Sequence, residues 1–563
     1  MFKVQRVSEH RNGDDLLSAG LGLAGLRSMA PPAFANAEAP TPTELRRRAI
    51  WSNWRGIADL TPAGGFGTVY GSLPDIPGRE YQAFATVPGA TQPHRVLTQI
   101  PDTFDSNRRC LVVTASSGSR GVYGAIAVAA PWALPKGCAV AYTDKGAGTD
   151  YYDLAQRRGV RIDGTLGKDD EALAFKPDSN AVAGIAFKHA HSKDNPEADW
   201  GLHVKQAAEY GLHALNHALP QHAPFTFENT RVIAVGISNG GGAVLRAAEL
   251  DGDWLRAVVA GEPNIYSEGS AARPLFDYAT EAALLMPCAL PKLGLPAVAD
   301  IDQRCAAAAA AGLIGGDDLG TRQTAAYDAL RASGWTDAAL RAGAISVTFD
   351  LWRTVAATYA SAYGRYAAGE EPCIAGFSAL NSDGSTRAST PAERAAWWSD
   401  ASGIPPGAGI SLRVADPAEP QTALNCLRAL WAGNEAAARR VKQGIVATRA
   451  GLPRKGLPVI VVHGLDDGLV PAAFSSAPYV AAARAAGADL RYWQVRHVQH
   501  FDAFLGLPQY GAVYLPLLPY VYRALDQVWA QLEGKTELPA DAVIETTPRG
   551  LGKALEAGHL ALP

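Results

Sequence analysis

The sequence predicts an α/β fold: a sheet of parallel strands covered by helices on both faces, with a large, mainly helical insertion. Short apolar runs, each of the length of a buried strand, alternate along the chain with longer segments of helical periodicity. This alternation is typical of parallel sheets that are buried on both sides. Between Asn264 and Leu452 the sequence changes to an alanine-rich block with helical patches. A connection of that length needs a structure of its own, so we expect an inserted domain there.

The individual elements follow from the same patterns. Strands are expected at residues 80–85, 94–100, 110–115, 138–143, 231–235, 255–260, 457–462 and 490–495. Helices are expected at residues 41–60, with Thr41 as N-cap, and at 203–219, 241–250, 321–332, 436–450 and 510–532. We therefore expect an N-terminal segment (1–44), a core built from 45–264 and 452–563, and an insertion domain (265–451).

The bulk composition argues against two classes of partner. Of the 563 residues, 48% are hydrophobic and 19% are charged, which is the balance of an ordinary globular protein. The formal net charge is -4, so the chain lacks the basic surface that binds nucleic acid. It contains no run of 18 or more apolar residues that could form a membrane span. We expect neither nucleic acid nor a membrane as partner.

The six cysteines leave two interpretations open. They form neither a CxxC motif nor a zinc-ligand cluster. Buried free thiols would be the simpler interpretation, whereas the even number permits disulfides if the compartment is oxidising. Cys288 and Cys305 are the closest pair in the sequence.

The N-terminal segment also allows two interpretations. Residues 16–26 are mildly apolar, Lys3 and Arg6 precede them, and Ala35-Asn36-Ala37 follows, as in a secretory signal. Acidic residues dilute the positive charge, however, and the apolar run is rich in glycine. The alternative is that these first forty or so residues belong to the mature protein and pack on its surface.

A glycine-flanked serine is the strongest candidate for a catalytic residue. Gly236-Ile237-Ser238-Asn239-Gly240 follows an expected strand and precedes an expected helix. In this context G-x-S-x-G predicts a nucleophile elbow, a tight turn that projects the serine hydroxyl at the carboxyl edge of the sheet. The alternative is a glycine-rich turn whose serine merely caps the helix.

An acid to orient a catalytic base is expected beyond a later strand, because the fold has the chain order serine, acid, histidine. The segment HGLDDGLVP at 463–471 follows the expected strand 457–462 and offers Asp466 and Asp467. Esterases of the fold that has the nucleophile elbow commonly show H-G-x-x-D-x-x-V-P at this place, and that spacing selects Asp467. The alternatives are Glu262, which follows the preceding strand, and two aspartates that only cap a turn.

The base should follow the last strand, where the chain offers His497 and His500. We expect His500, because it lies beyond the strand and opens the helix-like segment HFDAF. His189 and His191 have a spacing that metal ligands use, but no third ligand lies near them in the sequence. We expect those two histidines to pack or to form hydrogen bonds near the site, and no metal site.

An oxyanion hole needs two N–H donors. One is expected from Asn239, the residue after the serine, and the other from the loop that follows the strand 110–115. That loop, SSGSRG, is small and turn-prone, and we expect the amide of Ser117 or, next, of Gly118 to be the donor. An ordinary polar turn is the alternative.

Four long and unusual segments carry a resemblance to a known family. SSGSRGVYGAI, AVAYTDKGAG, KHAHSKDNPEADWG and SNGGGAVLRAAE together resemble the D-3-hydroxybutyrate oligomer hydrolases, and the similarity extends over nearly the whole chain. The resemblance implies an α/β-hydrolase fold and a serine carboxylesterase that cleaves short 3-hydroxybutyrate oligomers, down to the dimer, through an acyl-enzyme. Ser238 matches the lipase-box serine of that family. This chemistry requires no cofactor.

The resemblance also bears on location and on the insertion. It implies that residues 16–26 belong to the mature chain and that the protein is exported to the periplasm or beyond, with a cytoplasmic location as the alternative. The insertion is expected to form a lid that sets substrate specificity. Its Trp352, Trp397, Trp398 and Trp431 are expected mainly in the core, with one or two of them walling an acyl pocket.

Three other functions have to be weighed. A broader polyester, feruloyl or tannin-type esterase would use the same three residues under a different lid. A peptidase of the same fold would need an acidic cluster to hold the substrate amine. A non-catalytic binding protein commonly lacks one member of the triad, whereas the chain offers all three.

Overall fold

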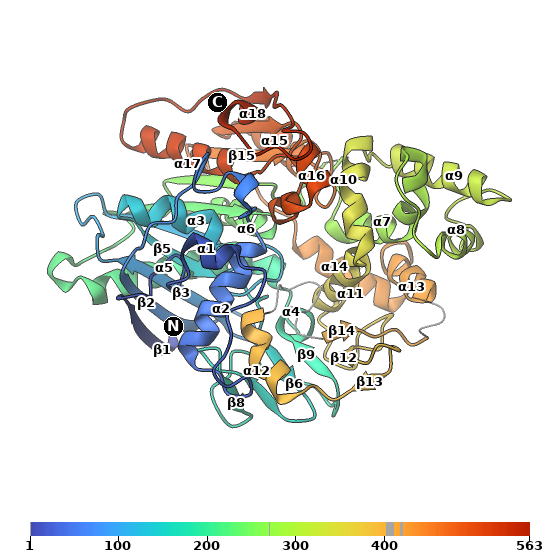
Figure 1. The fold of residues 1–563 in the computed structure, drawn as a ribbon, viewed down its shortest axis with the longest axis horizontal. Helices are drawn as coiled ribbons and strands as arrows, with labels where there is room; N and C mark the ends of the chain where they lie inside the picture. Colours follow the sequence, from blue (N-terminus) through green and yellow to red (C-terminus); the bar gives the residue numbers. More distant parts are fainter. Residues whose placement is uncertain (1, 270, 401–409, 417–419) are drawn as a thin grey trace.

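The computed structural model describes residues 2–269, 271–400, 410–416 and 420–563. Its centre is a ten-stranded sheet with the strand order β1-β2-β3-β5-β4-β10-β11-β15-β16-β17 (Figure 1). In chain order these strands are β1 (Lys3–His10), β2 (Gly78–Ala85), β3 (His94–Pro101), β4 (Cys110–Ala115), β5 (Ala139–Thr143), β10 (Arg231–Ile237), β11 (Ala257–Gly261), β15 (Val459–Gly464), β16 (Leu490–Val495) and β17 (Ala542–Ile544).

Helices cover both faces of this sheet, as predicted. One face packs against α1 (Gly22–Arg27), α2 (Pro42–Arg55), α3 (Ile126–Ala133) and α17 (Leu518–Leu532). The other face packs against α5 (Trp200–Ala218), α6 (Asn239–Ala248) and α15 (Ser476–Ala485). Successive residues of β4 point to opposite sides, so that Val112 joins the first core and Leu111 and Val113 the second. Strands buried on both faces explain why their sequences are continuously apolar.

The sheet is mixed, which corrects the expectation of parallel strands throughout. From β5 through β4 and β10 to β17 every neighbouring pair is parallel. The pairs β1–β2, β2–β3 and β3–β5 are antiparallel. Only eight residues separate β2 from β3, too few for the crossover that a parallel pair requires.

Two of the predicted helices have different limits. The helix expected at 41–60 ends at Arg55, and Thr41 caps its start in a reciprocal capping box with Glu44. The helix expected at 510–532 is two helices, α16 (Pro508–Val513) and α17. Pro516 lies just before the start of α17, and Pro519 is the second residue of that helix. A proline cannot continue an existing helix because it lacks the N–H donor.

The segment between β11 and β15 is mainly helical and has a hydrophobic core of its own. It contains α7 (Leu275–Ala289), α8 (Ile301–Ala310), α9 (Leu319–Ala332), α10 (Asp337–Thr348), α11 (Leu351–Gly364), α12 (Pro391–Asp400), α13 (Pro420–Ala432) and α14 (Ala436–Ala447). All but α12 gather to one side of the sheet, whereas α12 lies beside α2 (Figure 1). A short sheet of β12 (Phe377–Leu380), β13 (Thr386–Arg387) and β14 (Ile410–Leu412) completes this segment.

Several small elements had no counterpart in the predictions. A second sheet, with the order β8-β7-β6-β9, lies between β5 and α5 in the chain. Its strands are β6 (Tyr151–Asp153), β7 (Arg158–Val160), β8 (Leu166–Lys168) and β9 (Ile185–Phe187). The short helices α4 (Lys188–His191) and α18 (Ala557–Leu560) were not predicted either. Strands of three residues are too short to show a period.

The N-terminal segment is part of the central sheet and not only a surface attachment. Residues Lys3–His10 form β1 at the sheet edge, and Leu16, Leu17 and Leu26 are buried in the first core. Among the residues that the structure describes, no helix combines the length and the apolar character needed to cross a membrane.

All six cysteines form disulfides. The pairs are Cys110–Cys138, Cys288–Cys305 and Cys373–Cys426. The pair that is closest in sequence is thus bridged, and the alternative of free thiols is wrong for every cysteine. The first bridge joins the start of β4 to the residue before β5; the other two lie within the insertion.

Candidate active site

Ser238 stands in a sharp turn between β10 and α6, at the carboxyl edge of the sheet. Its backbone has φ 55° and ψ −126°, a conformation that a residue other than glycine seldom adopts. The turn is tight enough that a Cβ on Gly236 would lie 2.2 Å from the Gly240 carbonyl oxygen. A Cβ on Gly240 would lie 2.3 Å from the carbonyl oxygen of Ala115 in β4. The two glycines of the motif are therefore required by close backbone contacts.

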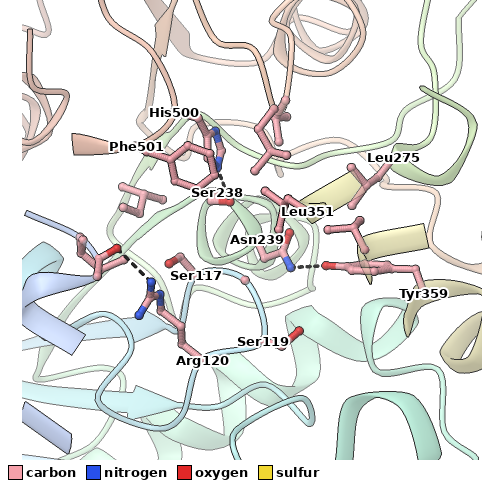
Figure 2. Close-up of a pocket in the computed structure, with 17 residues that line it drawn as sticks. Ser117, Ser119, Arg120, Ser238, Asn239, Leu275, Leu351, Tyr359, His500 and Phe501 are labelled. Atoms are coloured by element: carbon pink, nitrogen blue, oxygen red, sulfur yellow. Dashed lines mark hydrogen bonds between the residues drawn. The ribbon is translucent and has the colours of Figure 1, made fainter. Parts of the chain in front are cut away.

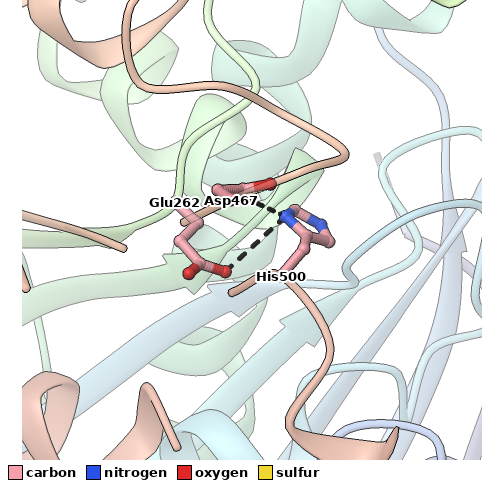
Figure 3. Close-up of side chains that lie close together, drawn as sticks. All are labelled: Glu262, Asp467 and His500. Atoms are coloured by element: carbon pink, nitrogen blue, oxygen red, sulfur yellow. Dashed lines mark hydrogen bonds and ion pairs between the residues drawn. The ribbon is translucent and has the colours of Figure 1, made fainter. Parts of the chain in front are cut away.

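Ser238 and His500 are in direct contact. The Nε2 atom of His500 lies 2.9 Å from Ser238 Oγ, and its Nδ1 atom lies 2.8 Å from Asp467 Oδ2 (Figures 2 and 3). An ionised carboxylate can only accept a hydrogen bond, so Nδ1 carries the proton and the neutral ring presents Nε2 to the serine as an acceptor. The three residues follow β10, β15 and β16; in the sheet β11 lies between β10 and β15, and β16 is next to β15.

Asp467 is held as an anion. Its Oδ1 atom accepts hydrogen bonds from the amides of Leu469 (2.8 Å) and Val470 (2.7 Å). Burial by itself raises the pKa of Asp467, but the charge of His500 and hydrogen bonds from His463 and His500 outweigh it. The pKa therefore lies well below its ordinary value. A fixed negative charge at this place would stabilise the imidazolium form of His500.

Glu262, the alternative acid, lies at the same histidine but farther away. Its Oε2 atom is 3.6 Å from His500 Nδ1, whereas Asp467 is 2.8 Å away (Figure 3). Burial and the negative charges of Asp467 and Asp502 raise the pKa of Glu262 well above its ordinary value. Two adjacent buried carboxylates do not both ionise readily, and the shorter contact shows which one carries the charge.

Among the described residues, the only cluster of three side chains able to hold a metal ion is Glu262, Asp467 and His500. Both nitrogens of His500 have protein partners, Asp467 at Nδ1 and Ser238 at Nε2. His189 and His191 are not part of any such cluster. The structure directs them to different partners, Ser119 (2.5 Å) and Glu371 (2.7 Å).

The neighbouring candidates from the sequence point elsewhere. His497 directs its Nδ1 atom to the hydroxyl of Thr546 at 3.0 Å. Asp466 lies next to Asp467, but the described hydrogen bonds of His500 include none to it. Of the two candidate aspartates, Asp467 is hydrogen-bonded to His500, and of the two candidate histidines, His500 contacts Ser238. Asp466 and His497 take no part in these hydrogen bonds.

The expected amide donors lie around Ser238. Asn239 is the first residue of α6, so its N–H has no partner within the helix. Ser117 and Gly118 line the same pocket as Ser238, and their amides donate to no other group in the described part of the chain (Figure 2). The arrangement can present two N–H groups to a developing negative charge.

Lys145 holds the loop that carries Ser117 and Gly118 through hydrogen bonds, a role that the sequence did not indicate. Its buried ammonium group donates to the Gly118 carbonyl (2.5 Å) and to the Ser116 hydroxyl (3.0 Å). Burial lowers the pKa of Lys145 to about 7, although the nearby carboxylates of Asp144 and Glu197 act in the opposite direction. The carbonyl of Gly118 is thereby held by Lys145.

A second group that the sequence did not indicate is Tyr359 of α11. The side-chain amide of Asn239 donates to the Tyr359 hydroxyl at 2.5 Å and accepts from Asn264 at 2.9 Å (Figure 2). His189 packs edge-on against the Tyr359 ring and bonds Ser119. These contacts join the insertion to both loops that surround Ser238. A lone tyrosine in a helix carries no signal of such a role.

The pocket over Ser238 is mainly apolar and has an empty volume of about 780 Å3. Helices of the insertion contribute Leu275, Leu351 and Val355 to its wall, and Phe501 adds an aromatic ring (Figure 2). None of the four tryptophans considered from the sequence is among the described lining residues. Trp352, Trp397 and Trp398 are buried in hydrophobic cores, and Trp431 packs against one, so the expectation that one of them walls the pocket is wrong.

A family model described as 3HB-oligomer hydrolase matches residues 2–561. The chain belongs to this family. The resemblance seen in the sequence is therefore confirmed, and with it the prediction of a carboxylic ester hydrolase. A protein of Paraburkholderia xenovorans (strain LB400) named D-(-)-3-hydroxybutyrate oligomer hydrolase is 37% identical to this 3HB-oligomer hydrolase family member, over 96% of this chain and 86% of the relative. A protein of the same name from Paracidovorax citrulli (strain AAC00-1) is 36% identical, over 97% and 89%.

Solved structures show only distant likeness. A tannin acyl hydrolase from Aspergillus niger matches with a TM-score of 0.34 and 12% identity, over 76% of this chain and 74% of that one. An esterase from Aspergillus oryzae matches with a TM-score of 0.32 and 11% identity, over 78% and 75%. The chain itself has a mixed central sheet with helices on both faces and a strand–serine–helix turn, as in an α/β-hydrolase.

Proposed function

We propose that this protein is a serine carboxylesterase that hydrolyses short 3-hydroxybutyrate oligomers, dimer and trimer included, through an acyl-enzyme. The observation that carries the proposal is the continuous chain Ser238–His500–Asp467, with contacts of 2.9 and 2.8 Å, beneath a largely apolar pocket. The names of the relatives give the substrate class.

The mechanism assigns one role to each side chain. His500 Nε2 takes the proton of Ser238 as Oγ attacks the ester carbonyl, and Asp467 holds the ring and stabilises the imidazolium. The amides of Asn239 and of Ser117 or Gly118 receive the oxyanion. His500 then gives its proton to the leaving 3-hydroxyl oxygen. A water molecule, deprotonated by the same nitrogen, attacks the acyl-enzyme and releases the acid.

In this proposal the insertion acts as a lid. It comprises residues 265–451, and the core comprises residues 45–264 and 452–563. Its residues Leu275, Leu351 and Val355 supply the apolar wall of the pocket, and Asn239 and Tyr359 hold it to the catalytic turn. Such a wall suits the methyl-bearing backbone of a hydroxybutyrate oligomer. Three disulfides support an oxidising location, periplasmic or extracellular.

The test is product analysis with purified protein. Wild type and Ser238→Ala are each given the 3-hydroxybutyrate dimer, the trimer, a feruloyl ester and a peptide. We expect wild type to release 3-hydroxybutyrate from the dimer and trimer, and Ser238→Ala to be at least about 10⁴-fold slower. Intact dimer and trimer, with cleavage of another ester, would overturn the substrate; normal turnover by Ser238→Ala would overturn the mechanism.

A further inference from the structure

Arg120 is a cation in the pocket whose hydrogen-bonding capacity is largely unused. It lies on the same loop as Ser117, and its Nη2 atom donates to the Gly56 carbonyl at 3.0 Å (Figure 2). No other side-chain hydrogen bond of Arg120 is formed within the described part of the chain, and its Nη1 atom is shielded from water without a partner. A guanidinium group has five N–H donors, so a partly buried one with a single bond requires an explanation.

Other buried arginines of this protein do have their counter-ions. Arg46 forms a double hydrogen bond with Glu80, and Arg95 forms one with Asp150. Arg120 has no ion pair with any described carboxylate. Burial lowers the pKa of Arg120 to about 10, so the group still carries its charge at neutral pH. Arg120 thus lines the pocket with a charge that no described carboxylate compensates.

The rest of the pocket makes this charge conspicuous. Of the 17 described lining residues, Arg120 is the only lysine, arginine, aspartate or glutamate. In Figure 2 it lies on the Ser117 side of Ser238, and Leu275, Leu351 and Tyr359 lie on the opposite side. Arg120 and these three side chains thus lie on different sides of the serine hydroxyl in this view, and Arg120 supplies the charge on its side.

The chemistry of the substrate matches this division. An oligomer of a hydroxy acid has one free carboxylate, at the end of its last unit. In every ester bond of such a chain, the acyl part leads to the hydroxyl end and the alcohol part leads to the carboxylate. The carboxylate therefore always belongs to the leaving group, and the uncharged acyl part can occupy the apolar side.

We infer that Arg120 binds the free carboxylate of the substrate, on the leaving-group side of the scissile ester; this inference rests on the proposed function. Arginine is suited to the task because its planar fork can give two parallel hydrogen bonds to a carboxylate. Anchoring the carboxylate end makes the enzyme cut at a fixed distance from that end and select short acids over long neutral polyesters.

The decisive experiment compares the 3-hydroxybutyrate dimer with its methyl ester, which differ only in the terminal charge. We expect wild-type kcat/KM to be about 10- to 100-fold higher for the free acid, the range for a hydrogen bond to a charged group. Arg120→Gln should reduce that ratio to within about threefold, mainly through KM, and Arg120→Lys should restore part of it. Inhibition by the product 3-hydroxybutyrate should weaken in parallel.

A second variant moves the guanidinium without removing it. A Cβ on Gly56 would lie 2.2 Å from Arg120 Nη1, so Gly56→Ala should shift the group and lower the same ratio. The matched control is Arg47→Gln, since Arg47 is also half-buried and donates to a backbone carbonyl, that of Ala19, but does not line the pocket. We expect this control to keep the wild-type ratio.

The possible outcomes distinguish a failure of the Arg120 inference from a failure of the proposed esterase function. Equal kcat/KM of wild type for the acid and its methyl ester overturns the Arg120 assignment, whatever the variants do. An equal loss for both substrates in Arg120→Gln also overturns it, since the residue would then serve the oxyanion or the fold. If wild type cleaves neither dimer nor trimer but hydrolyses a p-nitrophenyl ester through Ser238, the proposed function fails as well.

Discussion

The side-chain amide of Asn239 donates a 2.5 Å hydrogen bond to the hydroxyl of Tyr359, and so ties the turn that carries Ser238 to helix α11 of the insertion. The sequence suggested that Asn239 serves mainly through its backbone N–H. Its side chain has a second function, because the same residue joins the sheet edge to the wall of the pocket. The position of helix α11 is therefore linked to the geometry of the turn.

This link predicts a selective defect in Tyr359→Phe. The variant keeps the ring against His189 but loses the acceptor for Asn239. We expect kcat to fall about two- to tenfold, as for the loss of one neutral hydrogen bond, with little change in the melting temperature. The control is Tyr363→Phe, one turn along the same helix, whose hydroxyl bonds Glu197 and does not line this pocket. Equal kcat values for the two variants would contradict the positioning role.

The two buried acids at His500 should differ sharply in importance. Asp467→Asn replaces the charged acceptor at 2.8 Å and should lower kcat about 10³- to 10⁴-fold, because the ring then loses its correct tautomer and its counter-ion. Glu262→Gln should cost less than about tenfold, since Glu262 is the more distant group, 3.6 Å away. Steady-state kinetics of both variants decide the matter, and the opposite order would make Glu262 the orienting acid.

The two candidate histidines give an independent check. We expect His500→Ala to abolish turnover and His497→Ala to retain most of it, because only His500 contacts Ser238. Circular dichroism of both variants controls for misfolding. Loss of activity confined to His497→Ala would contradict the assignment of the base.

A fourth prediction concerns the dependence of stability on pH. Glu80 is buried and accepts hydrogen bonds from Arg46, Gln99 and Tyr123. Burial by itself raises the pKa of Glu80, but Arg46 and His10 outweigh it and lower the pKa to about 2. Because the folded-state pKa is depressed, Glu80 stabilises the fold at pH values above about 4.5, and this contribution is lost as the pH falls toward 2.

The corresponding measurement is urea unfolding of wild type and Glu80→Gln between pH 3 and pH 7. The shift implies a contribution of about 3 kcal/mol to the free energy of unfolding at pH 7, of which about 2 kcal/mol is lost by pH 3. Glu80→Gln should therefore lose more stability at pH 7 than at pH 3. The exposed Glu38→Gln serves as the control and should follow wild type at every pH. A constant difference between Glu80→Gln and wild type across this range would show that the carboxylate charge does not matter.

A fifth prediction concerns the disulfides. The Cys110–Cys138 bridge closes a loop of 28 residues between adjacent strands of the core. Such a loop implies a contribution of about 3 kcal/mol to the free energy of unfolding. The Cys110→Ala/Cys138→Ala variant should lose about that much. Protein unfolded without reductant should take up no iodoacetamide, and reduced protein should take up six equivalents; labelling before reduction would contradict the pairing.

Local sequence patterns were enough to predict most of the core and the order of the candidate residues. A buried strand is a short apolar run, and a turn as tight as that of Ser238 requires glycines. Both features can therefore be recognised from a few consecutive residues. The spacing in HGLDDGLVP distinguished Asp467 from its neighbour. The family resemblance depended on segments of the same kind and needed no tertiary information.

The features that only the tertiary structure decided are contacts between residues far apart in the chain. The antiparallel edge strands, the pairing of six cysteines and the contact of Lys145 with Gly118 leave no periodic signal. The same holds for Arg120, which is unremarkable in SSGSRG and becomes distinctive only because no described carboxylate lies beside it. Charge compensation is a property of three-dimensional neighbourhoods, so a missing counter-ion can be recognised only once the fold has brought the neighbours together.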